Sequence, residues 1–455
     1  MSLRGGTTKQ SVAFRRIFFD EIKAKFMVNA TDCFVVPPRN DTQLTYFLLF
    51  CSQIFIDMKE KIIVIGAGAF GGWTALSLLR KGYDVTLVDA WGAGHSRSSS
   101  GDETRVIRSV YVDRIYVEMA QRALQIWREN EPQFGHKIYH EIGVLNLIGQ
   151  DDSRLNAALK HFNSMNIPYQ ELSLNETKKR YPYFNLEDIS QVVMDTEAGY
   201  LLARMGCYVV KEAFVKEGGH YRLAEARPLP AKGGISSVNS ISNEKMQGIT
   251  LSDGSKLTAD HYVFACGPWL GKLFPEEIGS LVRPTRQEAF YFNVPSGCDI
   301  IERTPVWCDF SSLYQNVMMY GIPAGGSDAA GRGFKVAEDV LGDDFDPDTT
   351  ERLVTARWLD KARTFMHHRF PILRGMPLSE SRVCQYENTP DAHFLIDKLP
   401  TASNVWIMGG GSGHGYKMGA TVGEMMTKLI SGEADVNPIF SFNRFKDLTE
   451  KVERR

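Results

Sequence analysis

The sequence predicts an α/β fold: a parallel sheet assembled from distant segments, with a second, α+β domain inserted between them. The first observation is Ile62–Ile65, an unbroken β-branched run typical of a buried parallel strand, followed directly by a glycine-rich turn and a helical apolar repeat. The second is that the apolar runs Tyr262–Ala265 and Val405–Met408 also end at glycines. Because these similar segments lie far apart along the chain, we expect the sequence between them to supply a second domain.

Each element of this fold has its own local signal. The turn Gly66–Gly72 leads into a helix at Trp73–Lys81, where apolar residues recur at helical spacing. The second strand is Val85–Val88, and it ends at Asp89. The same criteria predict helices at 116–129, 153–165, 205–217 and 416–430, a short strand at 143–147, and a loop at 324–348, which is rich in Gly and Asp.

Composition and charge exclude several classes of protein. The chain has 455 residues, and its 52 Lys and Arg nearly balance its 54 Asp and Glu, so it lacks the basic surplus of a nucleic-acid-binding protein. Its 7 Cys include no Cys-x-x-Cys pair, which argues against a zinc site and a disulfide scaffold and fits reduced thiols in the cytoplasm. The longest apolar run, Tyr46–Ile56, is about half the length of a membrane span. We therefore expect a soluble, multi-domain, cytoplasmic enzyme with no metal site, no nucleic-acid partner and no membrane segment.

Residues 1–57 differ in pattern from the rest of the chain. Their basic stretch is interrupted by Asp20 and Glu21, unlike a transit peptide, and their apolar run comes too late for a secretory signal. Met58 then opens the segment that carries the first strand and the glycine turn. We interpret residues 1–57 as an N-terminal extension that the chemistry does not need.

The turn Gly66–Gly71 has the G-x-G-x-x-G spacing of a dinucleotide-binding motif. Gly66 permits the tight turn, Gly68 lets the backbone approach a pyrophosphate, and Gly71 lets the helix pack closely on the strand. Phosphates would then lie beside Phe70 at the helix N-terminus, where free N–H groups favour negative charge. Asp89 has the spacing of the acid that binds a ribose. The alternative is a glycine-rich turn that only connects a strand to a helix.

A second glycine-rich segment, containing Gly413, His414 and Gly415, favours FAD over NAD as the dinucleotide. A nicotinamide-binding domain is normally complete within one contiguous stretch, whereas a flavin also has a redox-active ring whose polar edge needs partners. A helix N-terminus after Gly415 can stabilise negative charge on that ring. We therefore predict FAD as the cofactor.

Several further motifs, in order along the chain, resemble one flavoprotein family. They are Ser98–Tyr111, Cys266–Trp269, Pro284–Gln287, Val383–Tyr386, Thr389–Asp397, Gly411–Lys417 and Ile439–Arg444. Together they make the chain from Met58 to about Phe445 similar to the monomeric sarcosine oxidase and N-methyltryptophan oxidase branch of the D-amino-acid-oxidase-like (DAO) family.

The resemblance implies a fold and an activity. The implied fold is a Rossmann-like FAD-binding domain at 58–137, 201–285 and 381–445, an interleaved mixed-sheet substrate-binding domain at 138–200 and 286–380, and a C-terminal tail at 446–455. The implied activity is oxidation of the C–N bond of a secondary amino acid, N-methyl or cyclic, to an imine, while O2 becomes H2O2. The implied enzyme is a monomer whose partners are its small amino-acid substrate and O2. A flavin dehydrogenase with another electron acceptor, a redox-silent flavin-binding module and a nicotinamide dehydrogenase are the alternatives.

The resemblance also implies roles for individual residues. Cys384 matches the family cysteine that binds the flavin covalently, although a buried cysteine without a role is the usual interpretation of such a residue. Arg108 and Lys417 match the pair that binds the substrate carboxylate, an anion that must be paired in a dry pocket. The alternatives are a solvated basic face for Arg105 and Arg108 and a surface position for Lys417.

Three more residues have counterparts in the family. Arg105 matches an arginine near the flavin ring, and Lys335 matches the lysine that activates oxygen, where a fixed cation stabilises nascent superoxide. Tyr320 matches an active-site tyrosine that borders the substrate. An exposed loop lysine and a buried core tyrosine are the alternatives for the last two residues.

Three positions depart from the family pattern. A family histidine is replaced by Ser100, with Glu103 inserted just after it. A second histidine is replaced by Asp339, and an aromatic residue by Gly411, which removes a side chain from the pocket. We expect an enlarged substrate site that suits a bulkier N-alkyl amino acid or a cyclic imino acid better than sarcosine.

Overall fold

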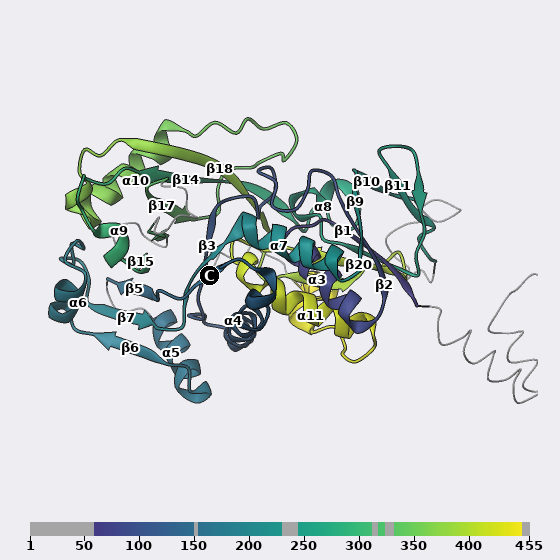
Figure 1. Cartoon of the computed structure of the whole chain (residues 1–455), viewed down its shortest axis with the longest axis horizontal. Coiled ribbons are helices and arrows are strands. Elements are labelled where there is room, and N and C mark those ends of the chain that lie inside the picture. The colour runs from purple at the N-terminus through teal and green to yellow at the C-terminus, as the bar shows by residue number, and fades with distance from the viewer. Residues whose placement is uncertain (1–58, 150–152, 230–243, 312–316, 324–331, 448–455) are drawn as a thin grey trace, which may run out of the picture. The chain divides into compact units, whose positions relative to one another are not determined.

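The computed structural model describes residues 59–149, 153–229, 244–311, 317–323 and 332–447 (Figure 1). The predicted extension at 1–57 lies outside the described residues, as do 448–455 of the predicted tail and 324–331 of the predicted loop. Within the described ranges, no helix is both long and apolar enough to cross a bilayer.

A six-stranded sheet forms one layer of the fold. Its strands lie in the order β19-β20-β13-β1-β2-β9, of which the five from β20 to β9 run parallel and β19 is antiparallel at the edge. The bounds are β1 Lys61–Ile65, β2 Asp84–Asp89, β9 His220–Leu223, β13 His261–Phe264, β19 Leu395–Lys398 and β20 Val405–Gly409. The three apolar runs that predicted a parallel sheet are therefore confirmed as the neighbouring strands β1, β13 and β20.

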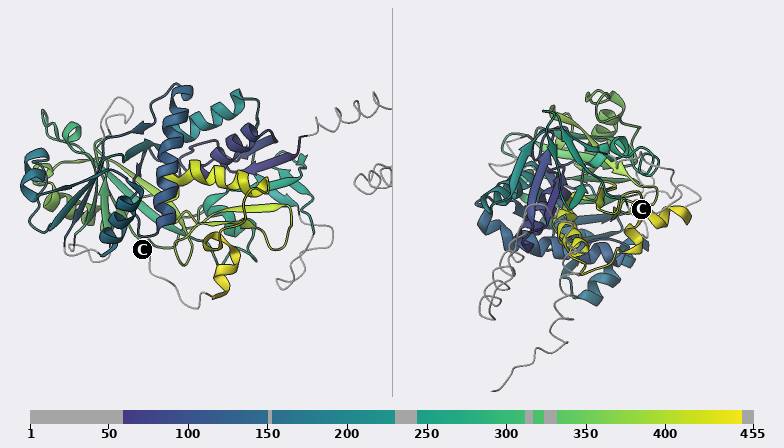
Figure 2. Two further views of the ribbon diagram at one scale, coloured as in Figure 1. Left: turned by 90° about the horizontal axis from the view of Figure 1, so that it is seen from below. Right: turned by 90° about the vertical axis from the view of Figure 1, so that its right-hand side faces the viewer.

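Strand β1 shows how this sheet is buried on both faces. Ile62 and Val64 point to one core and Ile63 and Ile65 to another, because successive side chains of a strand alternate. A helical layer covers the first face, as Figure 2 shows; it consists of α3 (Ala69–Lys81), α4 (Arg114–Phe134), α7 (Ala203–Lys216) and α11 (Gly419–Ile430). The continuous apolar run is thus explained by burial on both sides.

All four helices begin at positions other than predicted, α4 and α7 two residues earlier and α3 and α11 by more. Helix α3 begins at Ala69 rather than Trp73, so the end of the glycine motif already belongs to its first turn. The helix predicted from Tyr416 begins as a 3₁₀ turn, η4 (Tyr416–Met418), before α11. The two helices approach closely at Gly423, where a Cβ would lie 2.7 Å from the Trp73 carbonyl carbon. Glycines at the start of a helix, or where two helices touch, add nothing to an apolar periodicity. The pattern therefore underestimates the length of α3.

An eight-stranded mixed sheet forms the second part of the fold. Its order is β18-β14-β17-β16-β15-β5-β7-β6, antiparallel except for the parallel pair of β15 and β5. The bounds are β5 Val144–Ile148, β6 Tyr169–Leu172, β7 Gln191–Asp195, β14 Arg283–Phe292, β15 Val306–Phe310, β16 Met318–Gly321, β17 Phe334–Asp339 and β18 Leu378–Asn388. The predicted domain boundaries at 285 and 380 fall inside the long paired strands β14 and β18.

The loop predicted at 324–348 is wrong for one part of that range. Residues Phe334–Asp339 form strand β17, which pairs with β14 and β16 in the eight-stranded sheet. Phe334 and Val336 lie in the core, and Lys335 between them is buried as well. A lysine among glycines and acidic residues suggests a solvated loop, but the Lys335 ammonium pairs with the buried carboxylate of Asp102.

The remaining elements complete the two parts. Two small sheets are β3 (Thr104–Ile107) with β8 (Gly199–Leu202) and β4 (Tyr139–His140), and β10 (Ala226–Leu229) with β11 (Gly248–Leu251) and β12 (Lys256–Leu257). The other helices are α5 (Ser153–Met165), α6 (Leu174–Arg180), α8 (Leu270–Leu273), α9 (Ile300–Arg303) and α10 (Ala356–Arg369), and the other 3₁₀ turns are η1 (Gly267–Trp269), η3 (Pro371–Leu373), η5 (Pro438–Phe440) and η6 (Phe442–Asp447). Strand β3 matters most for the site, because it lies in the segment that connects the glycine turn to the mixed sheet.

Candidate active site

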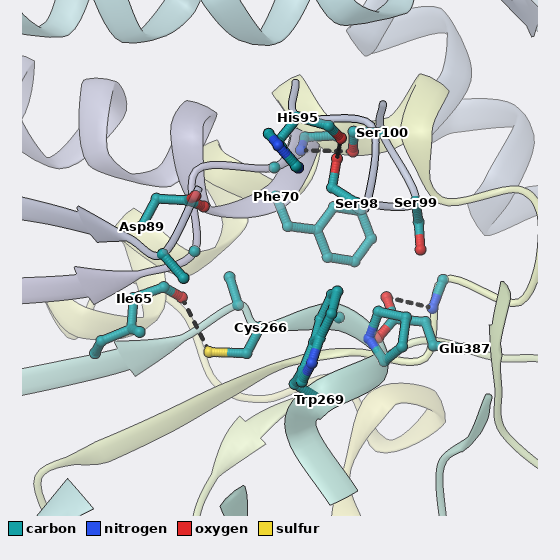
Figure 3. Close-up of a pocket in the computed structure, with 18 of the residues that line it drawn as sticks. Ile65, Phe70, Asp89, His95, Ser98, Ser99, Ser100, Cys266, Trp269 and Glu387 are labelled. Carbon is teal, nitrogen blue, oxygen red and sulfur yellow. Dashed lines mark hydrogen bonds between the residues drawn. The ribbon is translucent and has the colours of Figure 1, made fainter. Parts of the chain in front are cut away.

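A cavity of about 770 Å³ lies at the carboxyl ends of the parallel strands (Figure 3). This volume is within the range of roughly 300–1,000 Å³ typical of cofactor sites. The turns after β1, β2 and β13, the end of β18 and the loop after β20 line it. Ligands of parallel α/β sheets bind at this edge, where loops and helix N-termini converge. We call this space the large cavity.

The glycine motif forms one wall of the large cavity. Gly66 has a φ of +104°, and a Cβ there would lie 2.3 Å from the Ala265 carbonyl oxygen, so only glycine fits. Gly68 and Phe70 line the cavity at the start of α3. Gly71 is not part of the lining; a Cβ there would lie 1.8 Å from the Gly66 carbonyl oxygen. Gly66 and Gly68 therefore shape the cavity, and Gly71 allows α3 to pack against the turn.

Asp89 lies at the end of β2 with both carboxylate oxygens held in place. Its Oδ2 accepts the Ala67 N–H at 2.7 Å, and its Oδ1 accepts the N–H groups of Trp91 and Gly92 at 2.9 and 2.7 Å. Oδ2, which accepts one hydrogen bond, can still accept a further one from a ligand hydroxyl. The first-turn N–H groups of α3 favour an anion close by. The residues present therefore fit the ribose and pyrophosphate of the predicted FAD.

The second glycine-rich segment divides between two cavities. Gly413 and Gly415 line the large cavity, whereas His414 lines a smaller one beside it. The ring Nε2 of His414 lies 3.0 Å from the Ala392 carbonyl oxygen, which fixes its orientation. A Cβ at Gly415 would lie 3.1 Å from the Phe70 ring, so the two glycine segments meet across the cavity wall.

The smaller cavity, of about 60 Å³, adjoins the large one, and we call it the small cavity. The two share four lining residues, which are Arg105, Tyr386, Gly413 and Tyr416. Five further candidate residues line the small cavity: Arg108, Tyr320, Cys384, His414 and Lys417. Strands β3, β16 and β18 and the turn before α11 bring these residues to one place.

Two cations converge on the ring of Tyr111 at the small cavity. The Arg108 guanidinium carbon lies 4.9 Å from the centroid of that ring, and the Lys417 Nζ lies 5.7 Å from it. Lys417 is 7% exposed and donates a hydrogen bond to the His414 carbonyl oxygen at 3.3 Å, while half-buried Arg108 donates to the Val110 carbonyl. Neither residue is a solvated surface cation, so the surface alternatives for them are wrong. A buried lysine and a half-buried arginine beside a cavity have the charge to pair with a small anion.

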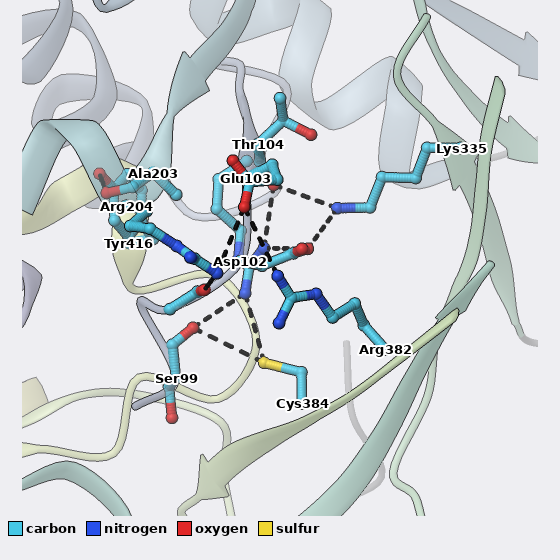
Figure 4. A network of polar contacts seen from close by, with 12 residues as sticks. Ser99, Asp102, Glu103, Thr104, Ala203, Arg204, Lys335, Arg382, Cys384 and Tyr416 are labelled. Atoms are coloured by element: carbon cyan, nitrogen blue, oxygen red, sulfur yellow. Dashed lines mark hydrogen bonds and ion pairs between the residues drawn. The ribbon is translucent and has the colours of Figure 1, made fainter. Parts of the chain in front are cut away.

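The Cys384 thiol lies next to a fixed guanidinium. Arg105 Nη2 lies 3.3 Å from Cys384 Sγ and donates a second hydrogen bond to the Ser99 carbonyl oxygen at 2.9 Å (Figure 4). Arg105 Nη1 pairs with Asp102 Oδ2 at 2.6 Å. Cys384 therefore lies at the wall of the small cavity, beside a guanidinium that its other partners hold in place.

Lys335 is 1% exposed, so the exposed-loop alternative for it is wrong. Its Nζ lies 2.6 Å from Asp102 Oδ2 and 3.1 Å from the Thr104 carbonyl oxygen. Burial alone would raise the pKa of Asp102, but Lys335 and Arg105 outweigh it and hold that pKa well below its usual range. Lys335 lines neither cavity, and it reaches the site through the carboxylate that it shares with Arg105. The sequence analysis missed Asp102, although its place in the Ser98–Tyr111 motif pointed to the site.

The inserted Glu103 is the centre of a second ionic cluster (Figure 4). Its Oε1 lies 3.2 Å from Arg204, 3.1 Å from Arg332 and 3.5 Å from Arg382. These arginines come from α7, from the start of β17 and from β18. The insertion therefore ties the segment that carries Asp102 to three other elements, a role that no local pattern predicts.

Two of the departures from the family pattern take part in the site. Ser100 Oγ accepts the Ala69 N–H at 3.2 Å, so it caps the start of α3 within the large cavity. Asp339 lines the small cavity, near enough for its charge to raise the pKa of Arg108 against the effect of burial. Tyr320 lines the same cavity, and burial raises the pKa of its hydroxyl, which keeps that hydroxyl protonated. The small cavity thus contains an acid beside its cations.

The third departure does not enlarge the small cavity. Gly411 lines the large cavity instead, and a Cβ there would lie 3.3 Å from Glu387 Oε1. The Glu387 side chain occupies space beside this glycine, so the expected gain in substrate volume is wrong for the cavity that Arg108 and Lys417 line. Glu387 is also a site residue that the sequence analysis missed; burial raises the pKa of its carboxyl to about 7.

Comparison with known proteins gives one family. The family model described as DAO, FAD dependent oxidoreductase, matches residues 61–429. Monomeric sarcosine oxidase from Bacillus sp. (strain NS-129) is 30% identical over 393 residues, which is 84% of this chain and 96% of that protein. Peroxisomal sarcosine oxidase from Homo sapiens is 27% identical, covering 85% of this chain and 96% of that protein. N-methyl-L-tryptophan oxidase from Yersinia pestis (strain Pestoides F) is 24% identical, covering 86% and 100%.

Solved structures show the same fold. L-proline dehydrogenase from P. horikoshii superposes with a TM-score of 0.71 at 19% identity, covering 85% of this chain and 98% of that chain. Fructosyl peptide oxidase from E. terrenum superposes with a TM-score of 0.70 at 18% identity, covering 84% and 92%.

Proposed function

The chain belongs to the DAO family of FAD-dependent oxidoreductases, and from that premise we propose that it oxidises the C–N bond of a small secondary amino acid, N-methyl or cyclic, to an imine, with O2 reduced to H2O2. It is an FAD-dependent oxidoreductase of the sarcosine oxidase type. The observation that carries the proposal is the pair of largely buried cations, Arg108 and Lys417, at a small cavity that adjoins the large one.

The small cavity selects the substrate by charge and size. An amino-acid carboxylate taken out of water needs paired cations, which Arg108 and Lys417 supply. Tyr320 and Tyr386 border the same space and would hold the rest of the substrate against the shared wall. Binding the carboxylate fixes the substrate in one orientation and excludes water from the reacting bond. A cavity of about 60 Å³ favours a small substrate over a bulky one.

The large cavity holds FAD, which supplies the two-electron chemistry when bound. Gly66, Gly68 and the start of α3 would bind the pyrophosphate, and Asp89 the ribose. Cys384 is proposed to attach the flavin covalently, because its sulfur lies 3.3 Å from Arg105, a side chain that lines both the large and the small cavity.

Lys335 is proposed to support the reaction with O2. Lys335 and Arg105 share one carboxylate, Asp102, so two cations and one anion leave a net positive charge behind the wall of the small cavity. A fixed positive charge stabilises the negative charge that develops on oxygen. Lys335→Met should therefore slow reoxidation of the reduced enzyme and spare its reduction by substrate; the reverse pattern would contradict this role.

An anaerobic substrate screen tests the proposed function. Sarcosine, other N-methyl amino acids, proline and pipecolate are each mixed with the purified yellow enzyme, and loss of flavin absorbance is followed. We expect at least one to bleach the flavin, and admission of air to restore the colour with formation of peroxide. Bleaching without peroxide would point to a dehydrogenase with another acceptor, and failure of every amine to a redox-silent module. The monomeric state and the cytoplasmic location stay predictions, to be checked by size-exclusion chromatography and cell fractionation.

A further inference from the structure

Glu387 brings a carboxyl group into the large cavity from the end of β18. Figure 3 shows it at the end of the pocket away from Asp89. Three consecutive residues at this end of the strand, Gln385, Tyr386 and Glu387, line the large cavity, while Cys384 lines the small one. If Asp89 binds the ribose and Cys384 the ring, Glu387 lies along the flavin half of the cofactor.

The carboxyl of Glu387 is only half satisfied by the protein. Its Oε1 accepts the Gly411 N–H at 3.4 Å. Its Oε2 is buried and has no hydrogen-bond partner among the described residues, and the side chain as a whole is more than nine-tenths buried. Leaving a buried polar atom without a partner costs free energy, so such an atom that faces a ligand cavity points to a ligand.

No cation compensates this carboxyl. No ion pair joins Glu387 to a lysine or arginine of the described residues, in contrast to Asp102 with Lys335 and Arg105. The charge of Glu387 affects Cys266, on the turn after β13, whereas the cations that line the same cavity, Arg105, Arg227 and Lys272, pair with other carboxylates. Burial therefore raises the pKa of Glu387 to about 7, against the backbone N–H groups of Gly411 and Gly410, which lower it. Below neutral pH the group is mainly a carboxylic acid, which has a hydrogen to donate.

We propose that Glu387 enters the site as a neutral carboxylic acid and donates the hydrogen on Oε2 to an acceptor atom of the bound flavin. The proposal rests on the proposed function in one respect, that the large cavity holds FAD. It adds a cofactor-positioning residue whose charge state sets the environment of the flavin. Loss of the proton leaves a buried anion beside the flavin and removes the hydrogen bond.

The test compares Glu387→Gln and Glu387→Ala with the control Asp397→Asn. Asp397 on β19 is also a carboxyl whose pKa burial raises, but it lines neither cavity. The flavin absorption spectrum of each holoenzyme, without substrate, is recorded between about pH 5 and pH 9. We expect a one-proton spectral step in the wild-type and Asp397→Asn proteins and none in either Glu387 variant. A step that persists in Glu387→Gln would overturn the proposal.

Retention of FAD gives a second readout, free of the covalent bond, in a Cys384→Ser background. Glu387→Ala should weaken FAD binding by about tenfold, the equivalent of one hydrogen bond. Glu387→Gln, whose amide still donates, should stay within about threefold of the parent. Unchanged binding in Glu387→Ala would contradict the hydrogen bond; if that variant does not fold, the spectral titration of Glu387→Gln decides alone. Protein that is colourless in every form would instead refute the proposed function.

Discussion

The buried pair of Asp102 and Lys335 allows a prediction with a magnitude. The two side chains are 5% and 1% exposed, and their charged atoms lie 2.6 Å apart. Removing one partner of a buried ion pair costs about 3–5 kcal/mol, because the other charge is left buried. In Lys335→Met, Asp102 keeps Arg105 at 2.6 Å and the Tyr291 hydroxyl at 3.0 Å. We therefore expect the lower end, a loss of about 3 kcal/mol in the free energy of unfolding.

The reciprocal change is expected to cost a similar amount. Asp102→Asn leaves the Lys335 ammonium buried without its counter-ion, with neutral carbonyl oxygens such as that of Thr104 as its acceptors. The double variant contains neither charge of the pair, so its loss should be smaller than the sum of the two single losses. We expect a coupling free energy of about 2–3 kcal/mol, within the range measured for residues in direct contact.

Urea unfolding of the holoenzymes, matched in FAD content, measures these differences, since a bound cofactor itself raises apparent stability. Lys81→Met is the control, because Lys81 forms an ion pair with Glu433 whose side chains are 45% and 48% exposed. Its loss should stay below about 1 kcal/mol. Additivity of the two site variants within about 0.5 kcal/mol would refute the reasoning, because it would mean that the two charges do not depend on each other.

Three further predictions follow from the same geometry. Cys384→Ser should release its flavin into the supernatant on acid precipitation, where the wild-type protein should retain it in the pellet; equal release from both would exclude the covalent bond. Arg108→Ala should raise the substrate KM by roughly 10- to 100-fold in steady-state assays, the value of one or two charge-assisted hydrogen bonds, and an unchanged KM would remove it from the site. Glu387→Gln should change the pH dependence of the free energy of unfolding. Because the wild-type pKa of Glu387 rises from 4.5 to about 7 on folding, the stability of the wild-type protein relative to the variant is full below pH 4.5. It falls by about 3 kcal/mol as pH rises through 7, as urea unfolding across this range should show.

The dinucleotide half of the site could be predicted from the sequence because its residues act over short distances. Gly66 has a positive φ, which glycine adopts without strain, and Gly71 packs against a residue five positions earlier. Asp89 is held by N–H groups of the glycine turn and of its own following turn. The parallel strands β1, β13 and β20 were likewise evident, because burial on both faces gives an unbroken apolar run.

The ionic half of the site could not be predicted in the same way. Lys335 stands in a stretch rich in Gly and Asp, and only strand pairing in the mixed sheet buries it against Asp102, more than 200 residues earlier. Glu103 has its three arginines on elements that lie far from it in sequence. A resemblance assigns Lys335 a role, but the carboxylate that balances its charge becomes evident only from the fold.

Gly411 and Glu387 show why a single departure from a family pattern misleads about the volume of the substrate cavity. Read alone, a missing aromatic side chain at Gly411 suggests a larger pocket, but the structure places a glutamate beside it and assigns both to the large cavity. The Glu387 carboxyl therefore sets the polarity beside this glycine, and the space at Gly411 is not added to the small cavity. Under the proposed function the substrate is selected elsewhere, at the small cavity, where Asp339 stands near Arg108. Substitutions at Asp339 should consequently change which amine is oxidised, whereas substitutions at Glu387 should change the flavin and leave the order of substrates intact.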